Sequence, residues 1–147
     1  MKNLKVYLDT SVLIPALSIN HPNHGACFEL LVEISKSKKE GFISNHGIFE
    51  LYSILTSLPL KPRTTPLYAE KLLEKNIYPY FKIVSITEKE IPELIKYISN
   101  EQFIGGIVYD YIHYFTALKS HTDILYTYNN KDFIQFKNNS KLKIKSP

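Results

Sequence analysis

Short apolar runs of strand-like composition alternate along this chain with longer segments in which apolar residues recur every three or four positions. We expect strands at residues 5–9, 41–44, 83–86, 123–127 and 142–145. The strongest helical patterns cover residues 23–38, 67–77, 87–99 and 107–120. This alternation predicts an α/β fold: a parallel sheet of four or five strands sandwiched by helices in three layers. At 147 residues, the whole chain (1–147) is expected to form a single domain.

Polar residues mark where several helices should begin. Thr10 and Ser11 are expected to cap a short helix after the first strand, with Pro15 near its start. Asn45 is expected to cap a helix that carries Glu50, and Thr87 another that runs to residue 99. The polar stretch 127–132 is expected to be a turn that leaves the fourth strand.

Composition excludes several classes of protein. The single cysteine, Cys27, excludes an internal disulfide and a cysteine-rich zinc site, and its apolar surroundings predict a buried side chain. No apolar run approaches the roughly 18 residues that a membrane-spanning helix needs. We therefore expect a cytoplasmic protein without a membrane partner. With 18 basic and 14 acidic residues, the net charge is +4, which suits a polyanionic partner and equally suits plain solubility.

Acidic side chains stand where elements begin or end. Asp9 ends the first strand, Asp132 follows the fourth, Asp110 lies near the start of the helix at 107–120, and Glu50 interrupts an otherwise uncharged segment, 46–60. Open parallel sheets place their sites beyond the carboxyl ends of the strands, so Asp9 and the segment containing Asp132 should converge. Clustered carboxylates beside apolar structure repel one another unless a cation joins them. The pattern predicts a site for a hard divalent metal.

Each acid has a simpler interpretation as well. Asp9 could cap the following helix, and Glu50 could be exposed on a partly buried helix. Asp110 could compensate a helix dipole, and the segment that contains Asp132 could be only a loop. His113, one turn after Asp110, could support the acids, but a surface or core role is favoured.

Four segments in order resemble the motifs of the PIN-domain nucleases, specifically the VapC-like toxins of toxin–antitoxin pairs. The first, residues 6–13, reads Val-Tyr-Leu-Asp-Thr-Ser-Val-Leu, and the second, 44–51, reads Ser-Asn-His-Gly-Ile-Phe-Glu-Leu. The third, 105–110, reads Gly-Gly-Ile-Val-Tyr-Asp, and the fourth covers 125–133. The proline-rich stretch 58–66 is similar to a loop of one subgroup. The likeness extends from the first strand to Phe133, and its strength lies in the ordered set.

The resemblance implies a metal-dependent ribonuclease. Asp9 and Asp110 would be the principal ligands of Mg²⁺ or Mn²⁺, with Glu50 and Asp132 as further candidates. Asn129 and Asp132 would position the attacking water or a second ion, and Thr10 and Thr127 would hold the carboxylates by hydrogen bonds. The RNA-contacting candidates are Lys61, Arg63 and Lys131. A cognate antitoxin and a homodimer are also implied.

One departure leaves an alternative open. Many PIN-domain nucleases carry an aspartate two residues after the threonine of the fourth motif, where this chain has Asn129. A catalytically silent module that recognises a protein partner is therefore the alternative interpretation of the function. A phosphoacceptor receiver domain, also a parallel α/β sheet, is set aside because Asp9 stands alone and the third strand ends in Ile86-Thr87-Glu88.

Overall fold

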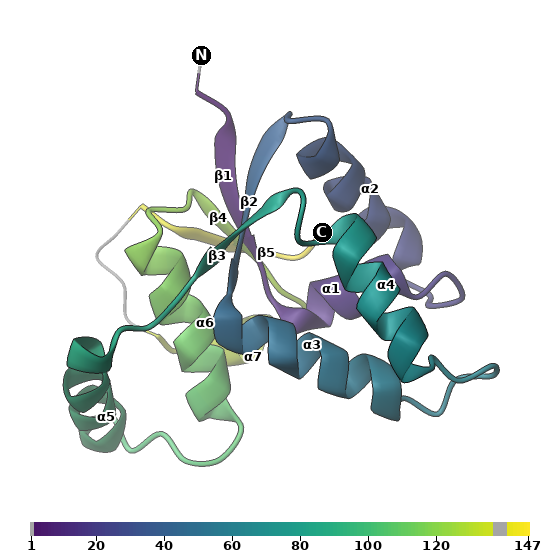
Figure 1. Ribbon diagram of the computed structural model, residues 1–147. Coiled ribbons are helices and arrows are strands. Elements are labelled where there is room, and N and C mark those ends of the chain that lie inside the picture. Colours follow the sequence, from purple (N-terminus) through teal and green to yellow (C-terminus); the bar gives the residue numbers. More distant parts are fainter. Residues whose placement is uncertain (1, 137–140) are drawn as a thin grey trace.

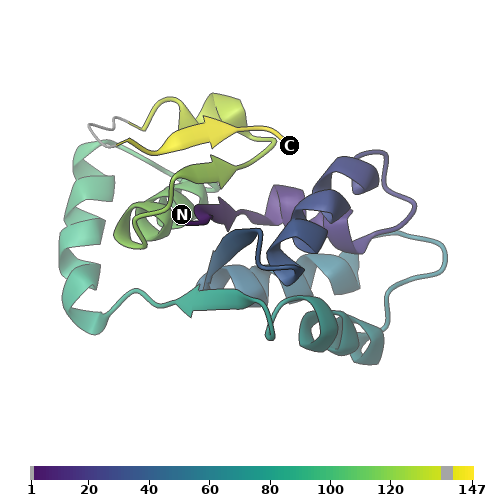
Figure 2. The ribbon, with the colours of Figure 1, turned by 90° about the horizontal axis from the view of Figure 1, so that it is seen from above.

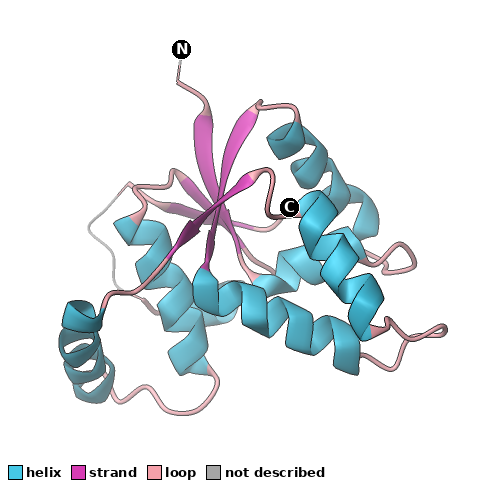
Figure 3. Cartoon of the chain, viewed as in Figure 1, coloured by secondary structure: helices cyan, strands magenta, loops and turns pink. Residues whose placement is uncertain are grey.

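The computed structural model describes residues 2–136 and 141–147, and within them five parallel strands form one sheet (Figures 1 and 3). The strands are β1 (Leu4–Leu8), β2 (Lys39–Ser44), β3 (Phe81–Val84), β4 (Ile124–Tyr126) and β5 (Lys143–Lys145). Their order across the sheet is β3-β2-β1-β4-β5, so the N-terminal strand lies in the middle. All four neighbouring pairs are parallel, with Val6 of β1 opposite Gly41 on one side and Ile124 on the other.

Helices cover both faces of the sheet (Figure 2). One face carries α1 (Thr10–Leu17), α2 (His24–Ser35), α3 (Asn45–Ser57) and α4 (Pro66–Asn76). The other carries α5 (Ile91–Asn100), α6 (Ile107–Lys119) and the short α7 (Asn130–Phe133), with the 3₁₀ turn η1 (Glu88–Glu90) leading into α5. The predicted α/β class, the parallel sheet and the three layers are confirmed. Among the described residues, no helix is long and apolar enough to cross a lipid bilayer.

Alternation along β1 divides the core in two. Val6 and Leu8 face the α1–α4 layer, whereas Tyr7 faces the layer that contains α6, and all three are fully buried. Side chains of successive strand residues point to opposite faces, so a central parallel strand must be apolar on both. Of these three residues, only Tyr7 carries a polar side-chain group, and its buried hydroxyl needs a hydrogen-bond partner in the interior.

The order of connections creates a crevice at one edge of the sheet. From β1 the chain passes to β2 and β3 through helices on one face, then returns through α5 and α6 on the other face to β4, beside β1. The carboxyl ends of β1 and β4 therefore lie at a topological switch point, where open α/β sheets place their sites. Asp9 directly follows β1 and Thr127 directly follows β4.

Several predicted boundaries were wrong in informative ways. Asp9, rather than Thr10 or Ser11, is the N-cap of α1, and Pro15 lies inside that helix instead of near its start. Ser44, rather than Asn45, caps α3, because its hydroxyl accepts a hydrogen bond from the Gly47 N–H.

Other boundaries depend on the neighbouring elements. Strand β3 begins and ends two residues earlier than the predicted 83–86, because its register is set by pairing with β2. Residues 130–133 form α7 where a turn was expected. The helix start at Thr87, the helix beginning at Ile107 and the fifth strand are confirmed.

Candidate active site

Asp9 is a buried carboxylate held at the end of the central strand. Its side chain is 1% exposed, and its Oδ1 accepts hydrogen bonds from the Ser11 N–H (3.0 Å) and the Ser11 hydroxyl (2.5 Å). Burial raises the pKa of Asp9, while hydrogen bonds from Ser11 and Thr127 act against that rise. Asp9 is therefore a helix cap, as the simpler interpretation held. Capping does not prevent the same carboxylate from also taking part in a site at this edge of the sheet.

Hydroxyl groups tie the ends of β1 and β4 together around Asp9. The Ser11 hydroxyl accepts a hydrogen bond from the Tyr128 N–H (2.9 Å) and lies 3.4 Å from the Thr127 hydroxyl. The Thr127 hydroxyl in turn accepts from the Asn129 N–H (2.9 Å). Thr127 therefore contacts the acid that it was predicted to hold, and Ser11, expected only as a cap, shares that position.

The negative charges of two other acids act on Asp110. Burial, the negative charges of Asp132 and Asp9 and a hydrogen bond to Asp132 together raise the pKa of Asp110 to about 7, and burial is the largest of these causes. Compensation of a helix dipole stabilises a negative charge and would lower this pKa. Compensation of a helix dipole therefore does not account for the raised pKa of Asp110. The structure thus places Asp110 of α6 near Asp132 of α7 and near Asp9, the N-cap of α1.

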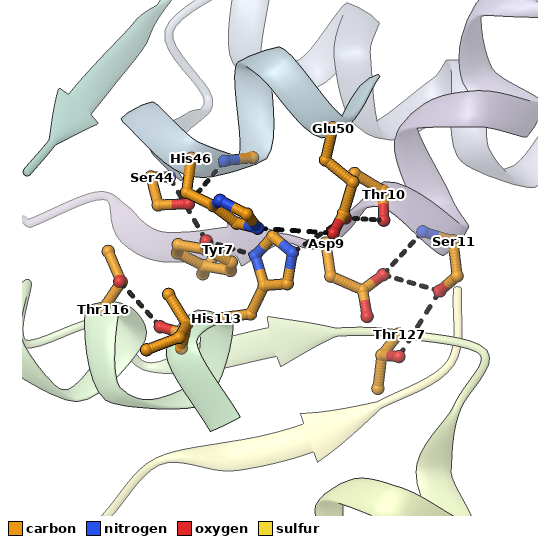
Figure 4. Close-up of polar contacts among 12 residues, drawn as sticks. Tyr7, Asp9, Thr10, Ser11, Ser44, His46, Glu50, His113, Thr116 and Thr127 are labelled. Atoms are coloured by element: carbon orange, nitrogen blue, oxygen red, sulfur yellow. Dashed lines mark hydrogen bonds and ion pairs between the residues drawn. The ribbon is translucent and has the colours of Figure 1, made fainter. Parts of the chain in front are cut away.

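Glu50 lies beside Asp9 in a very different setting (Figure 4). Its Oε1 accepts hydrogen bonds from the Thr10 hydroxyl (2.5 Å) and the His113 Nε2–H (3.1 Å), and its Oε2 lies 3.6 Å from His46 Nε2. Burial alone would raise the pKa of Glu50, but the bonds from His113 and Thr10 outweigh it and lower the pKa to about 2. Glu50 is held ionised, and its side chain is only 22% exposed, which excludes the fully exposed interpretation.

His113 and Tyr7 form a buried pair behind Glu50. His113 is 2% exposed, and its Nδ1 lies 2.6 Å from the Tyr7 hydroxyl, which also accepts a hydrogen bond from the Ser44 N–H (3.2 Å). Sequence reasoning favoured a surface or core role for His113 and did not single out Tyr7 or His46. The available signal was spacing: His113 lies one helical turn after Asp110, and His46 one turn before Glu50.

The remaining predicted residues differ in their distance from the acids. Asn129 is exposed at the N-terminus of α7, and Lys131 is exposed on that helix beside Asp132. Lys61 and Arg63 belong to the loop after α3, at the end of that helix remote from the strand ends (Figure 1). There they line a hollow of about 310 Å³ together with Pro59, Leu60 and Pro62. Lys131 therefore neighbours Asp132 along α7, whereas the loop with Lys61 and Arg63 lies apart from the acids.

The donor set suits a hard divalent cation. Within residues 2–136 and 141–147, no three His, Cys, Asp or Glu side chains converge closely enough to enclose an ion by themselves. Mg²⁺ does not require such a cage, because it keeps several waters and is commonly held by one or two carboxylates. The mutual repulsion that raises the pKa of Asp110 is relieved by a cation between these oxygens. The chemistry of the pocket therefore fits Mg²⁺ or Mn²⁺ bound by Asp9 and Asp110.

Comparisons with known proteins place the chain independently. The PIN-domain sequence model matches residues 6–139. Ribonuclease VapC27 of Mycobacterium tuberculosis is 32% identical over 103 residues, covering 70% of this chain and 69% of VapC27.

Two solved structures share the fold. One is Mycobacterium tuberculosis VapC20, described as a sarcin-ricin loop cleaving toxin, with a TM-score of 0.67 and 14% identity over 92% of this chain and 98% of that one. The other is VapBC2 of Rickettsia felis bound to a promoter DNA fragment, with a TM-score of 0.64 and 18% identity over 98% of this chain and 99% of that one.

Proposed function

Because the chain belongs to the PIN-domain family, we propose that it is a Mg²⁺- or Mn²⁺-dependent endoribonuclease that serves as the toxin of a toxin–antitoxin pair in the cytoplasm. The observation that carries the proposal is that Asp110 lies close enough to Asp132 and Asp9 for their charges, together with burial, to raise its pKa to about 7. The homology to a ribonuclease supports the reaction, and the fold shared with the toxin VapC20 supports the biological role.

The residues divide into two groups with different tasks. Asp9 and Asp110 would hold the divalent ion, with Asp132 beside them. Such an ion, when bound, lowers the pKa of a coordinated water and offsets negative charge on the phosphate. Ser11 and Thr127 hold Asp9 at the crevice by the hydrogen bonds described above.

Glu50 is suited to a separate role. It remains ionised with a pKa near 2, and Thr10 and His113 fix its Oε1. A fixed, ionised carboxylate can orient the attacking water and accept a hydrogen bond from it. Asn129, at the start of α7, would supply an amide at the same edge but no charge.

The substrate and the protein partner are proposed from the surface. Lys131 is placed to attract an RNA phosphate near the acids, and Lys61 and Arg63 could contact only a more distant part of the RNA. A largely apolar groove of about 480 Å³ beside α3 and α4 is lined by eight residues, of which Phe49, Tyr52, Leu67 and Tyr78 are exposed and Leu73 is buried. Exposed apolar surface of this kind supports binding of an antitoxin or a second copy of the chain.

Cleavage of RNA by the purified chain tests the reaction. Wild-type protein should cleave RNA with Mg²⁺ or Mn²⁺ and lose activity with a chelator, and Asp110→Asn should be inactive because only a charge is removed. Asp123→Asn is the matched control: Asp123 is the one aspartate outside the pocket, where it accepts a hydrogen bond from the Lys5 N–H (2.9 Å). Activity in Asp110→Asn equal to that of the control would refute the assignment.

The silent binding module remains the second candidate, favoured by Asn129 and by the open arrangement of the carboxylates. Isothermal titration with Mg²⁺ or Mn²⁺ separates the two. A nuclease should show a binding site that Asp9→Asn and Asp110→Asn remove, whereas a silent module should show no such site. Growth arrest on expression, abolished by Asp110→Asn, would support the toxin role.

A further inference from the structure

Glu50 is held by a chain of hydrogen bonds that begins in the middle of the sheet. Starting from the backbone of β2, the contacts run from the Ser44 N–H to the Tyr7 hydroxyl, then to His113 and then to Glu50 (Figure 4). The chain joins β2, β1, α6 and α3. Tyr7 is fully buried and His113 is 2% exposed, so water cannot readily replace either contact.

The direction of each hydrogen bond follows from the groups themselves. Glu50 is ionised and can only accept, so His113 must donate from Nε2. A neutral imidazole that donates from Nε2 must accept at Nδ1, so the Tyr7 hydroxyl donates there. That hydroxyl has one proton, and it is free to be given to His113 because the Ser44 N–H is itself a donor.

We propose that Tyr7 selects the Nε2–H tautomer of His113, and that His113 thereby holds the Glu50 carboxylate in its working orientation. Burial strengthens this selection: it raises the pKa of Tyr7, so the hydroxyl keeps its proton. His113 and Tyr7 are positioning residues that act through Glu50. This inference rests on the proposed nuclease function, since it assigns them to the acid expected to orient the attacking water.

The local packing supports a dedicated arrangement. A Cβ added at Gly47 would lie 3.1 Å from His113 Cε1 and 3.0 Å from Ser44 Oγ, so the first turn of α3 closes tightly over the imidazole. The Tyr7 and His113 rings also meet edge to face, with centroids 5.7 Å apart. The imidazole is confined on these sides, so its tautomer depends on its two polar contacts, with Tyr7 at Nδ1 (2.6 Å) and Glu50 at Nε2 (3.1 Å), of which the Tyr7 contact is the shorter.

The first test reads the tautomer directly. Nitrogen NMR of imidazole-labelled, metal-free protein at pH 8 should show His113 as the Nε2–H tautomer. In Tyr7→Phe the signal should shift toward a mixture of both tautomers, because Nδ1 has lost its donor. The matched control is Tyr114→Phe: Tyr114 is also buried, but its hydroxyl has no hydrogen-bond partner among the described residues, so the spectrum should not change.

The second test reads the effect on catalysis. A glutamine at position 113 can present an amide N–H near the place of Nε2, whereas an asparagine reaches only as far as Nδ1. His113→Asn and Tyr7→Phe should lower kcat by about 10- to 100-fold with little change in KM, the range usual for residues that orient a catalytic group. His113→Gln should recover much of the loss, and Tyr114→Phe should match wild type.

Two results would overturn the inference: an unchanged His113 spectrum in Tyr7→Phe, or wild-type kcat in His113→Asn. Failure of the proposed function is distinguishable from both. A wild-type chain without ribonuclease activity would refute the nuclease, while the spectrum of the metal-free protein would still decide whether Tyr7 sets the tautomer.

Discussion

Removing the charge of Asp110 should make the metal-free protein more stable while abolishing its activity. In the folded chain, burial and the charges of Asp132 and Asp9 raise the pKa of Asp110 from 3.8 to about 7. The folded state therefore binds this proton more tightly than the unfolded state does. Its stability declines as the pH rises from about 4 to about 7, and the loss is complete above that range. Asp110→Asn has no charge to lose and should escape this penalty.

The size of the effect follows from the pKa difference. Each pKa unit corresponds to about 1.4 kcal/mol, so the difference between 3.8 and about 7 sets an upper limit of about 4 kcal/mol. Asp110 is only partly buried, and solvent screening reduces this to about 2 kcal/mol. For a chain of this size, such a gain raises the melting temperature by about 4–8 °C. The gain should be largest at pH 8 and less than half as large at pH 5, where wild-type Asp110 is already protonated.

Thermal melts of wild type, Asp110→Asn and Asp123→Asn at pH 8 and pH 5, with a chelator present, provide the measurement. Added Mg²⁺ should raise the melting temperature of wild type and of Asp123→Asn, but not that of Asp110→Asn. If Asp110→Asn melted at or below the wild-type temperature at pH 8, the carboxylates would not be repelling one another, and the argument for a cation site would lose its basis.

Three further outcomes are expected. Asp9→Ala should lower the free energy of unfolding by about 1 kcal/mol because α1 loses its cap, whereas Asp9→Asn should retain it; equal urea midpoints would contradict this. Gly41→Ala should cost about 1–3 kcal/mol, because its Cβ would lie 2.9 Å from Phe81 Cε1, and an unmoved thermal transition would speak against that packing. In cleavage kinetics, Lys131→Ala should raise KM more than Lys61→Ala, since only Lys131 adjoins the acids; the reverse order would place the RNA elsewhere.

The order of strands and helices could be predicted from the sequence, because it depends on the local spacing of apolar residues. Alternating segments with periods of two and of three to four residues require a parallel sheet covered on both faces, and that is the fold observed. The same pattern put Asp9 at the end of the first strand and Thr127 at the end of the fourth, each within one residue of the observed strand end, and parallel strands bring both to one edge of the sheet. Family membership, suggested by four ordered motifs, is confirmed by the match over residues 6–139.

The helix boundaries were harder to predict from the sequence, because the capping residue is decided by the geometry of the folded chain. Three polar residues in a row, Asp9, Thr10 and Ser11, could each begin α1, and the choice depends on which side chain meets a free backbone N–H. At α3 the same competition was won by Ser44, the last residue of β2. Lys61 and Arg63 were expected near the RNA because of their charge, but α3 carries their loop away from the strand ends.

From the sequence alone came the layers of the fold, the edge of the sheet where chemistry could occur, and the carboxylates that meet there. Tertiary structure alone decided how those carboxylates differ. Tyr7 and His113 are 106 residues apart and His113 and Glu50 are 63 apart, so no local pattern relates them. Their contacts hold Glu50 ionised with a pKa near 2, while burial and neighbouring charges raise that of Asp110 to about 7. The cause is that a carboxyl's pKa depends on the donors, charges and solvent around it, and these are brought together only by folding.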